Sequence, residues 1–175
     1  MNNAKVGIIL GSASDLPHAR KIGDTLKELG VAFEVTIASA HRTPDDTANY
    51  ARNASVRGLE AIIAVAGLSA ALPGAVAAQT TLPVIGVPVE SGSLLGMDAL
   101  LSTAMMPPGV SVASVGINGG TNAALLAARI IGSHDSETAA KLQAYADKKA
   151  AGVRAARTDA KAFDGLPMAP AEALK

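Results

Sequence analysis

"KVGIILGSASDLPHARKIGDTLKELG", residues 5–30, holds one complete strand–turn–helix unit and decides the class of fold. Residues 5–10 form a short, almost wholly apolar run, which is typical of a strand buried on both faces of a sheet. Residues 16–29 place apolar side chains at helical spacing, and Gly30 ends the pattern. Between them stands "GSASD", residues 11–15, where the strand passes into the helix. This order predicts the first half of a βαβ unit.

The alternation of strand and helix patterns then continues along the chain. Strands are predicted at residues 5–10, 31–38, 59–67, 82–89 and 110–117. Helices are predicted at residues 16–29, 44–57, 70–79, 97–105 and 121–131. Thr43, Pro44 and Asp46 form a capping-box-like start for the second helix. Five such pairs predict an α/β domain of three layers, with a central parallel sheet and helices on both faces.

A last helix begins at Ser136 and lies outside this alternation, so we expect it to pack on a neighbouring subunit. We expect one domain over residues 1–162 and a poorly ordered tail over residues 163–175, which contains two prolines. The chain is rich in Ala and Gly, and such small side chains bury little area in a monomer. Association would bury more, so we expect a homo-oligomer.

Composition excludes several classes of protein. Lys plus Arg and Asp plus Glu both number 15, so there is no basic field for nucleic acid. The absence of cysteine excludes disulfides and a thiolate nucleophile, and the three histidines lack the spacing of a metal site. The sequence shows no signal-peptide pattern and no apolar run of the ~18 residues that a membrane span needs. We expect a cytoplasmic protein that binds neither membranes nor metals.

Four loops follow the first four predicted strands, and in a parallel sheet these loops lie at one edge, where ligands bind. They are residues 11–15, 39–44, 66–74 and 89–96, all rich in Gly, Ser or Ala. "GSASD" has two interpretations: a simple helix cap, or an anion site built from backbone N–H groups, Ser12 and Ser14. It matches neither a dinucleotide fingerprint nor a P-loop, so NAD and ATP are poorly supported.

His41 and Arg42 add acid–base and anion-binding chemistry to this edge. Histidine exchanges protons near neutral pH, and arginine offers a planar fork for phosphate or carboxylate. The alternative is a surface loop whose histidine faces solvent. His18 and His134 are interpreted as solvated residues, and Asp98 as an exposed helix residue.

Seven segments together resemble the 5-(carboxyamino)imidazole ribonucleotide mutases of purine biosynthesis and the related aminoimidazole ribonucleotide carboxylases. The resemblance covers residues 5–160 and rests on "GSASD", "SAHRTP", "AGLSAALPG", "PVIGVPV", "GMDALLS", "MPPGV" and "NAALLAARI". It implies a flavodoxin-like domain, usually an octamer with active sites between subunits, that uses no metal and no organic cofactor. It also implies a phosphorylated aminoimidazole ribonucleotide as the substrate.

The resemblance also implies roles for individual residues. His41 matches the proton-transfer histidine of the family. On the same pattern, Arg42 binds the phosphate, and Ser12 and Asp15 bind the nucleotide. The complete set expected to bind substrate is Gly11, Ser12, Ser14, Asp15, Ser39, Arg42, Ala66, Gly67, Ser69 and Leu72. The implied reaction moves a carboxylate from the exocyclic nitrogen to ring carbon four.

The third loop departs from the family pattern. Mutases usually read AGGAAHLPG where this chain reads AGLSAALPG, so Ala71 stands in place of a histidine, and Leu68 and Ser69 also differ. Ser69 with a non-histidine at position 71 is similar to the carboxylases that use free CO2, but those typically have lysine where this chain has Arg42. The mutase is the expected activity. The alternatives are a direct carboxylase, a carboxylase of another heteroaromatic nucleotide, and a non-catalytic nucleotide-binding module.

Overall fold

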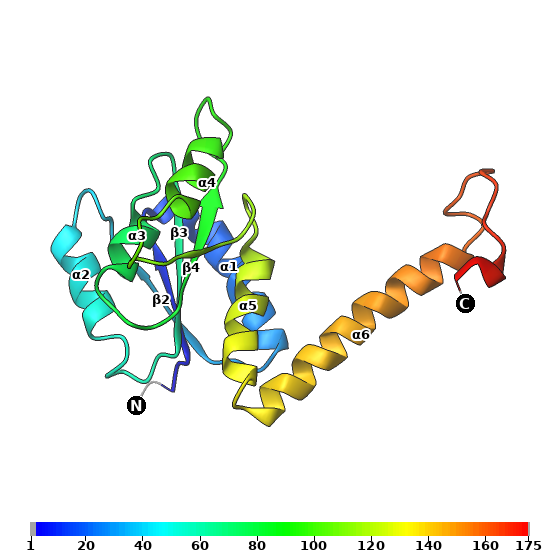
Figure 1. Cartoon of the computed structure of the whole chain (residues 1–175), viewed down its shortest axis with the longest axis horizontal. Coiled ribbons are helices and arrows are strands. Elements are labelled where there is room, and N and C mark those ends of the chain that lie inside the picture. The colour runs from blue at the N-terminus through cyan, green and yellow to red at the C-terminus, as the bar shows by residue number, and fades with distance from the viewer. Residues whose placement is uncertain (1–2, 175) are drawn as a thin grey trace.

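A computed structural model, which describes residues 3–174, contains a parallel five-stranded sheet in the order β2-β1-β3-β4-β5 (Figure 1). The strands are β1 Val6–Leu10, β2 Phe33–Ile37, β3 Ala61–Gly67, β4 Val84–Val89 and β5 Ala113–Ser114. The helices are α1 Leu16–Glu28, α2 Pro44–Arg52, α3 Leu72–Ala77, α4 Met97–Ala104, α5 Gly120–Gly132 and α6 Ser136–Thr158, with short 3-10 turns η1 Ala13–Asp15 and η2 Ala171–Leu174. This is the flavodoxin-like order, and it confirms the predicted three-layer α/β class.

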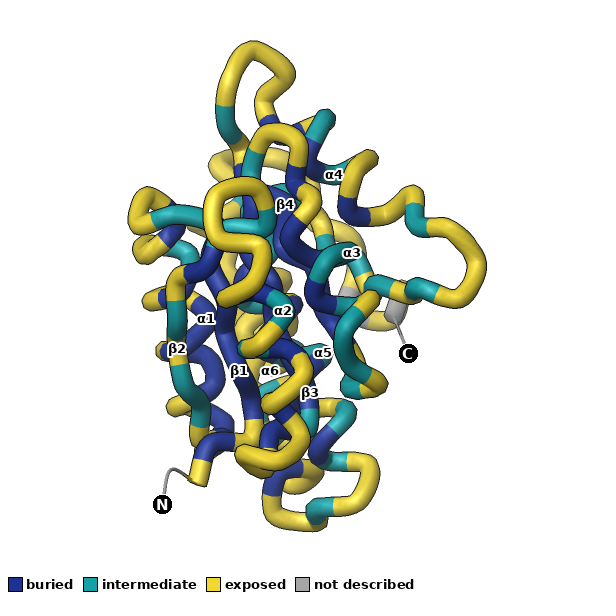
Figure 2. Tube along the Cα trace, turned by 90° about the vertical axis from the view of Figure 1, so that its left-hand side faces the viewer, coloured by how far each residue is buried: buried dark blue, intermediate teal, exposed yellow. Residues whose placement is uncertain are grey.

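The sheet separates two apolar cores, because successive side chains of a strand point to opposite faces. On one face, Ile8 and Ile63 pack against α1 and α5. On the other, Ile9 and Ile62 pack against α2, α3 and α4. Every residue of β1 and β4 is buried, which explains their almost wholly apolar sequences (Figure 2). The helices therefore cover both faces and leave the carboxyl edge of the strands open to loops.

Small residues set how closely the helices approach this sheet. A Cβ added at Gly86 in β4 would overlap the methyl group of Thr103 in α4, and would lie 3.2 Å from Cβ of Pro73 in α3. Gly86 therefore lets two helices pack directly against the strand backbone.

Two elements are shorter than predicted by five residues or more. Helix α2 ends at Arg52 rather than at residue 57, because residues 53–58 form turns. Arg57 turns back there to contact the Glu34 carboxylate of β2 at 2.9 Å, and Gly58 adopts a φ of +90°. The fifth strand has two ladder residues rather than the predicted eight, since β5 is an edge strand that pairs only with Ile85 and Gly86 of β4.

Helix α6 begins at a well-formed cap, where the carboxylate of Asp135 accepts a hydrogen bond from the Thr138 N–H at 2.9 Å. Its first half packs on α5 through Leu142 and Tyr145. Its second half projects away from the rest of the molecule (Figure 1). Packing of this half on a neighbouring subunit stays a prediction, as do the domain limits and the poorly ordered tail. No helix within residues 3–174 is long and apolar enough to cross a membrane.

Candidate functional site

A cavity of about 730 Å³ lies at the carboxyl edge of the sheet, between the loops that follow β1, β2, β3 and β4. All eleven residues singled out from the sequence line this cavity. They are Gly11, Ser12, Ser14, Asp15, Ser39, His41, Arg42, Ala66, Gly67, Ser69 and Leu72. The sheet topology thus brings together residues that are up to 61 positions apart (72 minus 11) in the chain.

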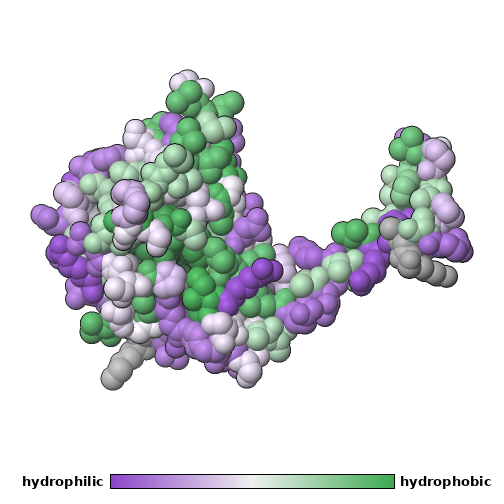
Figure 3. All heavy atoms as spheres, viewed as in Figure 1, coloured by the Kyte–Doolittle hydropathy of each residue, from purple (hydrophilic) through white to green (hydrophobic). Residues whose placement is uncertain are grey.

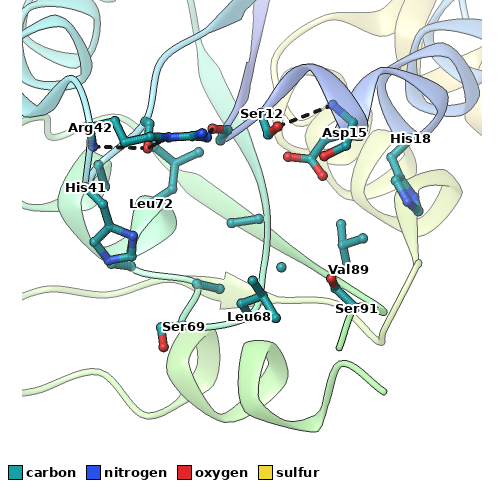
Figure 4. Close-up of a pocket in the computed structure, with 18 of the residues that line it drawn as sticks. Ser12, Asp15, His18, His41, Arg42, Leu68, Ser69, Leu72, Val89 and Ser91 are labelled. Atoms are coloured by element: carbon teal, nitrogen blue, oxygen red, sulfur yellow. Dashed lines mark hydrogen bonds between the residues drawn. The ribbon is translucent and has the colours of Figure 1, made fainter. Parts of the chain in front are cut away.

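The loop after β1 supplies a buried carboxylate at the start of α1. The hydroxyl of Ser12 accepts a hydrogen bond from the Ser14 N–H at 3.4 Å and so organises the short η1 turn. Asp15 occupies the N-cap position of α1, but its side chain makes no capping hydrogen bond. It is only 7% exposed, and burial raises the pKa of this carboxyl although Ser12, His18 and Arg42 oppose the rise. The Asp15 carboxylate therefore points into the cavity and does not cap the helix (Figure 4).

Arg42 links the first two loops. Its Nη2 donates to the Gly11 carbonyl at 3.0 Å, and its Nε donates to the Ser39 hydroxyl at 3.4 Å. The same hydroxyl accepts from the Arg42 backbone N–H at 3.2 Å. Thr43 is the N-cap residue of α2 and Pro44 is its first residue, as predicted. The predicted capping box is absent, because the Thr43 hydroxyl instead accepts from the Ser39 N–H at 2.9 Å and holds the loop. Ser39 and Arg42 thus fix the shape of one polar wall.

His41 lies at the opposite side of the cavity from Asp15, and its ring points into the cavity (Figure 4). Within the described part of the chain, no hydrogen bond to the His41 imidazole is found, whereas the ring of His134 contacts Glu60 at 2.8 Å. The His134 ring therefore contacts a carboxylate on the surface, outside this cavity. The His41 imidazole is available to a ligand as a proton donor or acceptor.

The loop after β3 forms an apolar wall. Ala70 and Leu72 are almost completely buried and line the cavity, and Leu68 beside them adopts a φ of +54°. The Ser69 hydroxyl points away from the Ser12–Asp15 side of the cavity (Figure 4). One wall, after β1 and β2, therefore suits an anion, and the facing wall suits an uncharged group.

The loop after β4 closes the remaining side with Val89, Glu90 and Ser91. Glu90 and Asn118 are paired twice, because the Glu90 N–H donates to the Asn118 side chain at 3.0 Å and the Asn118 amide donates to the Glu90 carboxylate at 3.1 Å. This pair ties the β4 loop to the segment that leads into α5.

Sequence reasoning missed several cavity residues. The sequence pattern predicts a solvated His18, but this residue is half-buried and lines the cavity one helical turn after "GSASD". The nearness of that motif is the signal that could have revealed it. The other missed residues are Ala40, Leu68, Ala70, Ala71, Val89, Glu90 and Ser91. Asp98 is half-buried rather than exposed, and its Oδ1 is buried without a hydrogen-bond partner in the described residues.

Comparisons with known proteins show the family to which the chain belongs. A mutase of Thermotoga maritima, named N5-carboxyaminoimidazole ribonucleotide mutase, is 52% identical over 144 residues, which are 82% of this chain and 84% of that protein. A phosphoribosylaminoimidazole carboxylase of Saccharomyces cerevisiae is 56% identical over 140 residues, which are 80% of this chain but only 24% of that longer protein. The crystal structure of Treponema denticola PurE superposes with a TM-score of 0.82 at 35% identity, covering 89% of this chain and 98% of that chain. The family model described as AIR carboxylase matches residues 5–152, and the chain therefore belongs to the AIR carboxylase family.

Proposed function

We propose that this protein is an N5-carboxyaminoimidazole ribonucleotide mutase, an isomerase of purine biosynthesis. One observation carries the proposal: a free imidazole, an anion-binding wall and an apolar wall face one cavity in a chain about half identical to proteins of that name. The reaction would move the carboxylate of the substrate from its exocyclic nitrogen to carbon four of the imidazole ring.

The polar wall is suited to the sugar phosphate of the substrate. Arg42 supplies the positive charge, and the Ser12 and Ser14 hydroxyls lie beside it at the start of η1 and α1. The N-terminus of a helix favours a phosphate through its dipole and its unpaired N–H groups. The Asp15 carboxylate would repel a phosphate, so it is suited to the ribose hydroxyl groups. Together these residues would hold the ring against the apolar wall.

His41 would move the proton that the reaction requires. Cleavage of the bond between nitrogen and the carboxyl carbon releases CO2, and its electron pair stays on the nitrogen, which takes a proton from His41. Carbon four then attacks the trapped CO2 and returns its own proton to His41, so atoms and charges balance. A positioned acid–base group contributes about 10²–10⁴-fold to such a step, and holding CO2 beside the ring contributes through proximity.

A direct carboxylase that takes up free CO2 is the second candidate. Two observations favour it: Ala71 stands where mutases of the family usually have a histidine, and the yeast relative named a carboxylase is 56% identical. That identity extends over only 24% of the yeast protein, whereas the Thermotoga mutase is matched over 84% of its length. The mutase is therefore the better-supported activity.

We also infer a cytoplasmic homo-oligomer, with an octamer as the expected form and active sites between subunits. Support comes from a cluster of exposed apolar side chains on and beside α4, named here the α4 patch. Its members are Leu94, Leu95, Met97, Leu101 and Met105. Figure 3 shows apolar side chains gathered over this upper part of the molecule. Exposed apolar patches mark contacts between proteins. The projecting half of α6 would pack on a second copy of the chain, either on its α4 patch or on another of its faces.

Substrate dependence separates the candidates. A mutase converts the carboxyamino ribonucleotide rapidly without added bicarbonate, and this is the expected result. A strict requirement for high CO2 together with the uncarboxylated ribonucleotide would identify a direct carboxylase. If the protein binds the ribonucleotide but turns over neither compound, it is a non-catalytic binding module.

A further inference from the structure

Non-glycine residues with a positive φ occur in three loops at the carboxyl edge of the sheet. In the described residues, four non-glycine residues have a positive φ, and three of them lie in the loops that follow β3, β4 and β5. They are Leu68 at +54°, Leu95 at +50° and Asn118 at +58°, whereas Asp164 at +45° lies in the tail. An L-amino acid with a bulky side chain is disfavoured in this region, and strain of this kind persists where the surroundings or a function require it.

Leu68 is the strained leucine that lines the cavity. Its backbone is fixed by two tight turns, because the Ala70 N–H donates to the Leu68 carbonyl at 2.8 Å and the Ala71 N–H donates to the Ser69 carbonyl at 2.6 Å. The side chain of Leu68 reaches the loop after β4: a Cβ added at Gly92 would lie 2.9 Å from Cδ2 of Leu68. Leu68 thus lies against the backbone of the facing loop.

The contact between these loops is apolar and extends the apolar wall. A Cβ added at Gly67 would lie 3.2 Å from the Cβ of Ser91, so the two loops face each other at adjacent positions. Among the other residues that line this part of the cavity, Ala70, Leu72 and Val89 are all less than 10% exposed, whereas Leu68 itself is 53% exposed. Leu68 therefore stands at the outer end of the apolar wall, between its buried residues and solvent.

CO2 is small and uncharged, so a protein retains it with dry apolar walls rather than with hydrogen bonds. We propose that Leu68 is a specificity-determining residue that covers the apolar wall and limits the escape of CO2 during carboxyl transfer. The inference rests on the proposed mutase function. It assigns the strain a purpose: the backbone with a positive φ carries a leucine whose side chain meets Gly92, between the buried apolar residues and solvent. Escaped CO2 is hydrated to bicarbonate and leaves the uncarboxylated ribonucleotide behind.

The test measures how the purified full-length protein partitions its carboxyamino substrate between the carboxylated product and the uncarboxylated ribonucleotide. Leu68→Asn tolerates a positive φ but is polar, Leu68→Gly removes the side chain, and Leu68→Met retains an apolar cover. Asp164→Gly is the matched control, because it relieves a positive φ far from the cavity. Labelled bicarbonate in the buffer reports exchange with CO2 from solution.

We expect Leu68→Asn and Leu68→Gly to raise the fraction of uncarboxylated ribonucleotide, and the incorporation of label, by about tenfold, the effect typical of losing one apolar contact in a small pocket. Both should also raise Tm by about 2–4 °C through relief of strain. Leu68→Met and Asp164→Gly should partition as the wild type does.

Unchanged partitioning in Leu68→Asn and Leu68→Gly, with the rise in Tm, would show that the strain serves the loop alone and would overturn the inference. Equal leakage from Leu68→Met would overturn it as well, since an apolar cover would then be insufficient. A wild-type protein that gives no product without added bicarbonate would instead overturn the proposed mutase function, and this inference with it.

Discussion

Arg42→Ala tests whether Arg42 binds the phosphate of the proposed substrate. In the described residues, the guanidinium uses two of its five N–H groups, one on the Gly11 carbonyl and one on the Ser39 hydroxyl. The other N–H groups are available to a phosphate at the polar wall. The same side chain also bridges two loops, so its loss can act either on the ligand or on the shape of the site.

The expected loss follows from the strength of hydrogen bonds to a charged group. Each such bond contributes about 1.5–3 kcal/mol, and every 1.4 kcal/mol corresponds to about a factor of ten in affinity. Arg42→Ala should therefore raise KM by about 10–100-fold. The value of kcat should change little, because the phosphate is remote from the reacting carbon and is bound equally in the ground and transition states.

A comparison of two substrates isolates the phosphate contact. Steady-state kinetics are measured for the carboxyamino ribonucleotide and for the corresponding ribonucleoside, which lacks the phosphate. Arg52→Ala is the matched control, since Arg52 lies outside the cavity and pairs with Gln79 at 2.8 Å. Arg42→Ala should raise KM for the ribonucleotide but not for the ribonucleoside, whereas Arg52→Ala should change neither value. An equal loss on both substrates would refute the phosphate role and would leave Arg42 as a bridge between loops.

Three further predictions concern charge, packing and assembly. Burial raises the pKa of Asp15 above the usual value of 3.8, so the folded protein loses stability as the pH rises above 3.8 and this carboxyl ionises. Asp15→Asn should therefore raise Tm near neutral pH, and thermal scans should show this increase in Tm becoming smaller as the pH falls toward 3.8. Gly86→Ala should lower stability by about 1–3 kcal/mol through overlap with Thr103, whereas Gly116→Ala, where a Cβ meets nothing within 4 Å, should leave Tm unchanged. Met105 is 77% exposed in the α4 patch, so Met105→Asp should give a smaller species by light scattering, and an unchanged mass would argue against that patch as an interface.

The sequence predicted the architecture where local pattern and burial coincide. The runs of β1 and β4 are buried along their whole length, so their apolar composition is sufficient to identify them. The fifth strand is different, because only two of the eight apolar or small residues predicted for it, at 110–117, form ladder pairs at the edge of the sheet. Helix α2 ends at Arg52, and the following turns bring Arg57 to Glu34 of β2, a contact between two elements that has no local sequence signal.

The site was predictable to the extent that sheet topology decides it. Once five parallel strands are inferred, the loops after them must share an edge, and this places His41 and Arg42 near "GSASD". The inclusion of His18 depends on which face of α1 turns toward the cavity, and a helical pattern alone does not give that. The backbone of Leu68 is also invisible to sequence patterns, because leucine does not favour a positive φ.

Proton transfer by His41 is the central claim, and His41→Asn tests it most directly when kcat and ligand affinity are measured on the same preparation. Asparagine keeps a polar side chain of similar size at the cavity but cannot exchange a proton near neutral pH. We predict that kcat falls by about 10²–10⁴-fold while the dissociation constant of the carboxylated product stays within about threefold. A variant that keeps wild-type kcat, or one that loses affinity in proportion to rate, would contradict the assignment of His41 as the proton-transfer residue.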